Sequence, residues 1–336
     1  MEITNKFNLP DTIYQAIKKD FHITAGDISV SQLIDAPQIR VLKKLHRNEL
    51  KQDVSDMIAA LVGTSSHAIL EQALYDNRIQ KSFDEVRNYF IDKKNNTHEA
   101  SELQHINTQL GFIDSVIAYE FPDQPEARYI SERTLHITVD GMTISGTFDL
   151  YDKTTFKLQD YKTCSTWAYM FPDSKTSWQA QLNVYAYMMR ENGYDVREAS
   201  IVAIFKDWSK SKVVQNADYP KQPVVEIPIK LYTHEKIGEY IKERVRLHKQ
   251  AEAGNIPECT SKERWGKADM WAVMVKGAKR ALKVVETEQG ANKFAELNKD
   301  NYEGLEIVHR PGENKRCNEY CQVRDFCEQY KKIKNG

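Results

Sequence analysis

Two aspartates and a lysine in residues 146–165 (GTFDLYDKTTFKLQDYKTCS) have the types and spacing of a hydrolytic metal site. If this stretch forms two neighbouring strands, Asp149 lies near the end of the first one. Asp160 and Lys162 then share a face of the second strand, because they are two residues apart. Close carboxylates repel one another unless a cation separates them, and their hard oxygens suit Mg²⁺ or Mn²⁺. A nearby lysine can orient a water or stabilise charge on a phosphate. The pattern indicates phosphodiester hydrolysis; its alternative is an exposed hairpin with scattered charges.

Three cysteines near the C-terminus form a C-x3-C-x5-C pattern made by Cys317, Cys321 and Cys327. Cysteines this close in a reducing compartment are typical of metal or cluster ligation. Such a site needs a fourth ligand, and Cys259 is the candidate. Cys164 is expected to be a small buried apolar residue.

The composition predicts one large domain, or a domain with appendages, that buries a sizeable core. The chain has 336 residues, of which 41% are hydrophobic and 28% charged. Its formal net charge is −1, so a nucleic-acid partner has to be met by local basic patches. No run approaches the roughly 18 apolar residues of a membrane span, and the first residues lack the layout of a secretory signal. We therefore expect a cytoplasmic protein.

Helical periodicity dominates the first hundred residues, and a polar stretch at 92–102 is expected to be an exposed loop. Helical spacing returns at 103–117. An apolar helix face is expected along residues 57–75, formed by Leu61, Ile69, Leu70 and Leu74.

The pattern changes to strand-like alternation over residues 127–164, where Asp140-Gly141 predicts a tight hairpin turn. A helix over 177–193 follows and is closed by Gly193. Two strands (198–208 and 223–230) and a charged helix (233–253) are expected after it.

The composition shifts at about residue 254, which marks the expected domain boundary. A linker-like stretch, a hairpin turning at Gly277, a helix and the cysteine-rich end follow. We predict an α/β core with a helical N-terminal region over residues 1–253. Residues 254–336 are expected to form a small segment that binds a metal or a cluster.

Five motifs that include the acidic pair follow one another along the chain: GTSSHAILE, SERTLHI, GTFDLYD, LQDYKT and QAQLNVYAYM. Over roughly residues 30–205 the chain resembles the RecB-like branch of the PD-(D/E)XK nuclease superfamily. That branch includes phage recombination exonucleases and CRISPR-associated iron–sulfur exonucleases. The resemblance implies a restriction-endonuclease-like core, in which helices flank a mixed central sheet.

The resemblance also implies site residues. Asp149 and the Asp160–Lys162 pair match the acidic ligands and the catalytic lysine. The remaining matches are His67 as a further metal ligand, Tyr161 as a ligand through its backbone carbonyl, Gln181 and Tyr185 as a helical pair that supports the lysine and contacts DNA, and Glu132 as the upstream glutamate. Each has a structural alternative: a core histidine, a buried helix pair, or a solvated strand residue.

In the iron–sulfur members, a cysteine near the N-terminus joins the three C-terminal ones. Here that position is Ala36, so Cys259 would have to replace it from another part of the chain. A [4Fe–4S] cluster, structural Zn²⁺ and free thiols remain open, and a bound metal would pin the tail to the core without redox chemistry.

Several basic runs are candidates for contacts to DNA phosphates, each with a solvated face as its alternative. They are Lys43, Lys44 and Arg47; Lys276, Lys279, Arg280 and Lys283; residues 242–249; and residues 331–334. Trp167, Tyr169 and Trp178 are candidates for stacking on unpaired bases or for the core.

The function expected from the resemblance is that of a Mg²⁺- or Mn²⁺-dependent deoxyribonuclease, an exonuclease of phage or bacterial recombination or repair. A structure-specific or single-strand endonuclease is the alternative within the class, and a non-catalytic DNA-binding subunit with a metal-stapled tail is the alternative outside it. No ATP-binding phosphate loop is present, so unwinding or annealing would come from a partner protein. The oligomeric state is left open.

Overall fold

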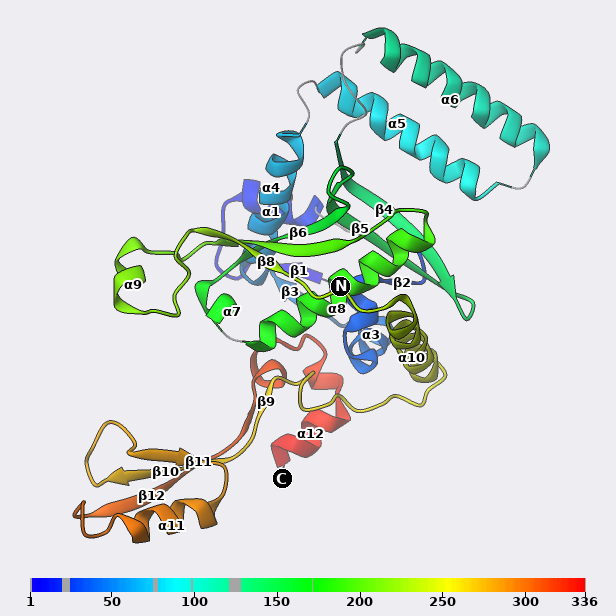
Figure 1. Ribbon diagram of the computed structural model, residues 1–336. Coiled ribbons are helices and arrows are strands. Elements are labelled where there is room, and N and C mark those ends of the chain that lie inside the picture. The colour runs from blue at the N-terminus through cyan, green and yellow to red at the C-terminus, as the bar shows by residue number, and fades with distance from the viewer. Residues whose placement is uncertain are drawn as a thin grey trace. The chain divides into compact units, whose positions relative to one another are not determined.

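The computed structural model describes residues 2–19, 25–74, 78–97, 99–120, 128–170 and 172–335 (Figure 1). The chain divides into two compact units. The sheet unit comprises residues 5–34 and 54–242, and the cysteine unit comprises residues 1–4, 35–53 and 243–336. Residues 254–336 thus lie in one unit with residues 35–53, a grouping that the sequence did not indicate.

A six-stranded mixed sheet forms the centre of the sheet unit. Its strands are β2 (Ile28–Ser29), β4 (Tyr129–Val139), β5 (Met142–Asp152), β6 (Lys157–Cys164), β7 (Glu198–Phe205) and β8 (Val224–Pro228). β5 pairs antiparallel with β4 and β6, and β7 runs parallel to β6 and antiparallel to β8. The strands carry alternating apolar residues that fill the core, among them Ile144, Phe148, Leu158 and Ile201. This mixed sheet with flanking helices confirms the predicted fold class.

The β4–β5 hairpin turns where the sequence predicts it. Val139 pairs with Met142, and the two residues between them, Asp140 and Gly141, have φ angles of 48° and 73°. Two left-handed residues make a type I′ turn, whose twist matches that of the strands. The hairpin fixes the register that positions Asp149.

Nine helices of the described residues lie wholly or partly in the sheet unit. They are α1 (Asp11–Lys19), α2 (Val30–Ile34), α4 (Ile58–Gln72), α5 (Arg78–Asn95), α6 (Ala100–Glu120), α7 (Thr166–Met170), α8 (Pro172–Glu191), α9 (Lys210–Gln215) and the first part of α10 (His234–Glu252). α8 packs on β4, β6 and β7 with fully buried Leu182, Val184 and Met188. Gly193 ends it as predicted, with φ 84° and a hydrogen bond from the Tyr194 amide to the Met189 carbonyl.

Two expectations for the helical region were wrong in part. The loop expected at 92–102 is shorter, because α5 continues to Asn95 and α6 begins at Ala100. Lysine and glutamate are good helix formers, and Lys93 pairs with Glu102 at 2.9 Å. The apolar stripe of α4 is not a core face: none of the residues of α4 is buried, and Ile69 is 67% exposed.

The cysteine unit combines short strands with helices around a small core. Its elements are β1 (Glu2–Thr4), α3 (Pro37–Leu45), β3 (Lys51–Asp53), the end of α10, β9 (Gly266–Lys267), β10 (Met270–Val275), β11 (Lys283–Val285), α11 (Glu288–Leu297), β12 (Leu305–Arg310), β13 (Glu313–Asn314) and α12 (Glu328–Asn335). The predicted hairpin at Gly277 and the helix after it are present, whereas β12 was not predicted. No helix of the described residues is long and apolar enough to span a membrane.

Candidate active site and four-cysteine site

Strand register brings the acidic residues together. Ser131 pairs with Leu150 and Arg133 with Phe148, which places Glu132 opposite Asp149 across β4 and β5. Leu150 pairs with Gln159, so continuing this antiparallel register places Asp149 opposite Asp160 on β6. Glu132 has a φ of 47°, a left-handed conformation that is costly for a residue with a Cβ. The strained backbone occurs at the residue that faces the acidic pair.

His67 reaches the same place from α4. Its Nε2 lies 3.0 Å from the Tyr161 carbonyl oxygen, which can only accept a hydrogen bond, so Nε2 donates. The other nitrogen, Nδ1, is then unprotonated in the neutral ring and lies 3.6 Å from Asp149 Oδ2 and 3.8 Å from Glu132 Oε1. Potential ligand atoms of these three residues all lie within 4.8 Å of one another.

The electrostatics of Asp149 fit a cation at this place. Burial, and after it the neighbouring carboxylate of Asp160, raise the pKa of Asp149 to about 6. His67, Lys162 and the Tyr161 amide, which donates to Asp149 Oδ2 at 2.7 Å, offset only part of this. A divalent cation would remove the repulsion and supply the missing charge.

Asp160 and Lys162 form a close pair on β6. Asp160 is 2% exposed, and its Oδ2 lies 2.6 Å from Lys162 Nζ. The contact lacks hydrogen-bond geometry, and no other described group hydrogen-bonds this buried oxygen. Buried carboxylate oxygens normally have a hydrogen-bond partner. The unsatisfied Oδ2 of Asp160 is therefore suited to binding a metal ion. The donor set thus fits Mg²⁺ or Mn²⁺, which His67 Nδ1 and the oxygens of Asp149, Asp160 and Glu132 would hold. The Tyr161 carbonyl, a ligand that the resemblance implies, lies instead at the other ring nitrogen, His67 Nε2.

Gln181 and Tyr185 lie one turn apart on α8, and their side chains hydrogen-bond each other. Tyr185 is buried; burial first, and then Asp160 and Asp149, raise the pKa of its hydroxyl. The phenol is therefore neutral and interacts with the acidic pair.

Gly146 was not singled out from the sequence but belongs to this site. A Cβ at Gly146 would lie 2.6 Å from the Tyr185 ring and 2.6 Å from a methyl group of Val30. Only glycine leaves this space to the tyrosine. A glycine inside a strand was the available signal, because it marks a close approach of the backbone.

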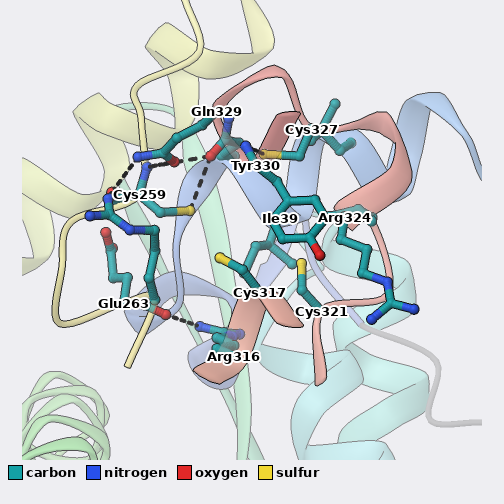
Figure 2. Close-up of a pocket in the computed structure, with 14 residues that line it drawn as sticks. Ile39, Cys259, Glu263, Arg316, Cys317, Cys321, Arg324, Cys327, Gln329 and Tyr330 are labelled. Carbon is teal, nitrogen blue, oxygen red and sulfur yellow. Dashed lines mark hydrogen bonds between the residues drawn. The ribbon is translucent and has the colours of Figure 1, made fainter. Parts of the chain in front are cut away.

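All four cysteines expected as ligands line one cavity of the cysteine unit (Figure 2). The backbone of Cys259 is fixed by Gln329, which accepts from its amide at 2.9 Å and donates to its carbonyl at 2.9 Å. Its thiol donates to Gln38 Oε1 at 3.1 Å. Ala36, the position where the resemblance predicts a cysteine, packs in the same small core as Cys259 and Cys327. Cys259 and Ala36 therefore belong to one neighbourhood, although they are far apart in sequence.

Burial and Glu263 keep the Cys259 thiol protonated, whereas Arg316 favours its thiolate form. Burial raises the pKa of Cys259 to about 12, and burial also raises the pKa of Cys317 and of Cys321. These thiols would lose their protons only to a bound metal. Arg316 interacts electrostatically with all three sulfurs and is itself held by Asp35, with two contacts of 2.7 Å.

The spacing of the sulfurs bears on the kind of metal. Four thiolates at about 2.3 Å from one zinc ion would lie about 3.8 Å apart in a tetrahedron. Among the described residues, no three cysteine sulfurs lie within 4.8 Å of one another. The sulfurs are therefore farther apart than four ligands of a single zinc ion would be. Cys164 lies outside the cavity, half-buried at the end of β6.

Some of the basic residues predicted to contact DNA form ion pairs within the protein. Lys44, Arg246, Lys331 and Lys332 each pair with a glutamate. Trp178 is 9% exposed and belongs to the core, whereas Trp167 is 58% exposed. Tyr169 packs edge-on against Phe205.

Comparison with known proteins identifies the family. The model of the PD-(D/E)XK nuclease superfamily matches residues 39–328, a range that includes the acidic residues, α8 and all four cysteines of the cavity. The chain belongs to this superfamily of nucleases. No curated protein matches the sequence.

Solved structures that resemble the chain include the following two. The crystal structure of SSO0001 has 14% identity and a TM-score of 0.38, with 74% of this chain and 94% of that chain covered. The crystal structure of a phage-related exonuclease from Haemophilus somnus 129PT has 15% identity and a TM-score of 0.25, with 52% of this chain and 82% of that chain covered.

Proposed function

We propose that the chain is a Mg²⁺- or Mn²⁺-dependent deoxyribonuclease, and specifically an exonuclease of phage or bacterial recombination or repair. The observation that carries this proposal is the convergence of His67, Glu132 and Asp149 beside the Asp160–Lys162 pair, in a chain of the nuclease superfamily. The exonuclease assignment, the RecB-like branch and the cytoplasm as the place of action rest on the resemblance of the five motifs.

The proposed roles follow from the contacts. His67 Nδ1 and the oxygens of Asp149, Asp160 and Glu132 would hold the metal. When bound, the metal lowers the pKa of water and offsets negative charge on the phosphate. Lys162, held beside Asp160, orients the attacking water or donates to the phosphate oxygens. The Tyr161 carbonyl fixes the tautomer of His67, because it accepts from Nε2.

We also propose that Cys259, Cys317, Cys321 and Cys327 bind a [4Fe–4S] cluster of structural importance. The proposal is supported by the shared cavity, by the wide spacing of the sulfurs and by the cationic surroundings. Iron and sulfide analysis of protein purified without oxygen tests it, and stoichiometric zinc without sulfide would contradict it.

Digestion of end-labelled linear DNA and of covalently closed circular DNA, with Mg²⁺ or Mn²⁺, tests the proposed reaction. We expect loss of the linear DNA alone, and we expect His67→Ala to abolish it. Cutting of the circle by the wild type but not by the variant would make the protein an endonuclease. Folded, metal-loaded protein that cuts neither substrate would favour a DNA-binding subunit.

A further inference from the structure

Residues 266–314 form a small module inserted between Cys259 and Cys317. A two-stranded stem opens and closes it, with Lys267 of β9 paired to Glu313 of β13 and Gly266 paired to Asn314. Between the stem strands, β11, β10 and β12 form an antiparallel sheet, and α11 packs on it (Figure 1). The module thus has a core of its own, in which Ala272, Val273 and Ala291 are fully buried.

The stem is tied to the four-cysteine site. Arg264 donates to the Asn314 side chain at 2.8 Å and also to the Cys259 carbonyl. The Arg316 amide, next to Cys317, donates to the Arg264 carbonyl at 3.1 Å. The residues that flank the two ends of the module, Arg264 and Arg316, therefore also contact or adjoin the cysteines.

The tip between β10 and β11 concentrates positive charge. Lys276, Lys279, Arg280 and Lys283 are all exposed, and the segment 270–285 contains no acidic residue. None of these four cations forms an ion pair or a side-chain hydrogen bond with another residue that the structure describes. The acidic residues of the module lie outside this segment: Asp269, Glu286, Glu288, Glu296, Asp300, Glu303, Glu306 and Glu313. Two of them are near the tip, because Glu306 pairs with Met274 across β12 and β10 and Glu303 precedes Gly304, whose carbonyl accepts from the Lys276 amide.

The tip also has a defined backbone. Gly277 makes the turn with φ 82°, and the Ala278 amide donates to the Val275 carbonyl at 2.9 Å. At the other end of the tip, the Leu282 amide donates to the Val273 carbonyl at 2.9 Å. Four cations are thus presented together on a hydrogen-bonded turn. Many cations of other basic runs are already neutralised by glutamates, as Lys44 is by Glu252.

We propose that this basic tip binds the phosphate backbone of DNA and holds the substrate of the nuclease. The assignment to DNA rests on the proposed function. Unpaired, exposed cations bind a polyanion through release of its counterions, and this needs no base recognition. The near-neutral chain concentrates its attraction for DNA at such a patch.

Two variants that remove equal charge from the same module test the proposal. The tip variant is Lys279→Gln with Arg280→Gln, and the control is Lys293→Gln with Lys299→Gln on or just after α11. Affinity for labelled duplex DNA, single-stranded DNA and RNA is measured against salt concentration, with Ca²⁺ replacing Mg²⁺ and the DNA recovered intact. Circular dichroism confirms that both variants fold.

We expect the tip variant alone to lower the slope of log Kd against log salt concentration. Two lost phosphate contacts lower it by about 1.8 for duplex DNA and about 1.4 for single strands, which weakens binding about 60-fold or about 25-fold at 0.1 M salt. Equal affinities and slopes for the tip variant and the control would overturn the proposal, as would a preference for RNA over both forms of DNA.

The outcomes separate this proposal from the proposed function. If the wild type cleaves DNA through Lys162 but the tip variant binds like the control, only the tip assignment fails. If the tip variant loses DNA binding but no metal-dependent cleavage occurs in the wild type, the tip assignment stands and the nuclease function fails.

Discussion

Replacing Asp149 with asparagine is expected to stabilise the metal-free protein while abolishing its DNA cleavage. Asp149 is buried beside Asp160, and these surroundings raise its pKa from an ordinary value of 3.8 to about 6. The folded protein therefore holds an unfavourable charge at neutral pH, which the metal would offset. Asparagine removes the charge and keeps an oxygen that can accept from the Tyr161 amide.

The size of the effect follows from the shift. A shift of about two pKa units corresponds to about 3 kcal/mol in the free energy of unfolding. Because the folded-state pKa lies above the unfolded value, the wild type carries no penalty below about pH 4 and loses stability as the pH rises through about 6. Asp149→Asn should therefore be more stable by up to about 3 kcal/mol above pH 7, and the difference should disappear near pH 4.

Urea unfolding in EDTA at several pH values measures this difference. Mg²⁺ or Mn²⁺ should then stabilise the wild type, by about 2.7 kcal/mol at a concentration one hundred times Kd, and should leave the variant unchanged. Asp152→Asn on the same strand is a matched control that should lower, not raise, the free energy of unfolding at neutral pH. Arg128, bonded to Asp152 at 2.6 Å, lowers the pKa of that carboxyl, so its stabilisation is present above about pH 4 and is lost as the pH falls. An Asp149→Asn variant that is no more stable than the wild type above pH 7 would refute the reasoning.

Two further substitutions test the surroundings of each site. Gly146→Ala should lower the free energy of unfolding by about 1–3 kcal/mol and slow DNA cleavage, because the new methyl group displaces Tyr185. Gly111→Ala is the control: a Cβ there meets nothing within 4 Å, so this variant should be neutral or stabilising. Urea unfolding and cleavage rates that do not distinguish the two variants would contradict the packing argument. Cys259→Ala should lose bound iron and Cys164→Ala should retain it, because only Cys259 lines the cavity; equal metal content by elemental analysis would remove Cys259 from the ligand set.

Local patterns predicted most of the elements that carry the candidate active site. Alternation over β4, β5 and β6, together with the Asp140-Gly141 turn, determines which side chains share a face, so the meeting of Asp149 with Asp160 follows from sequence alone. The backbone strain at Glu132 does not follow, because a left-handed glutamate has no sequence signal. The space left at Gly146 depends on Val30 and Tyr185, which are far from it in sequence.

The cysteine unit shows the limit of such reasoning more clearly. Counting cysteines suggested Cys259 as the fourth member, yet its neighbours Gln38 and Gln329 come from distant segments. The packing of Ala36 with Cys259 and Cys327 is likewise a long-range contact that periodicity cannot reveal. The domain boundary predicted between residues 253 and 254 stays a prediction. The two units that the structure forms are divided differently, because residues 35–53 group with the C-terminal segment.

The most direct test of the central claim is the single-turnover rate of DNA cleavage by Lys162→Ala at saturating Mg²⁺ or Mn²⁺. The account predicts a rate about 10²- to 10⁴-fold below that of the wild type, with metal binding by calorimetry retained because Lys162 is not a ligand. A variant that binds the metal and cleaves at the wild-type rate would show that the Asp160–Lys162 pair does not carry the chemistry.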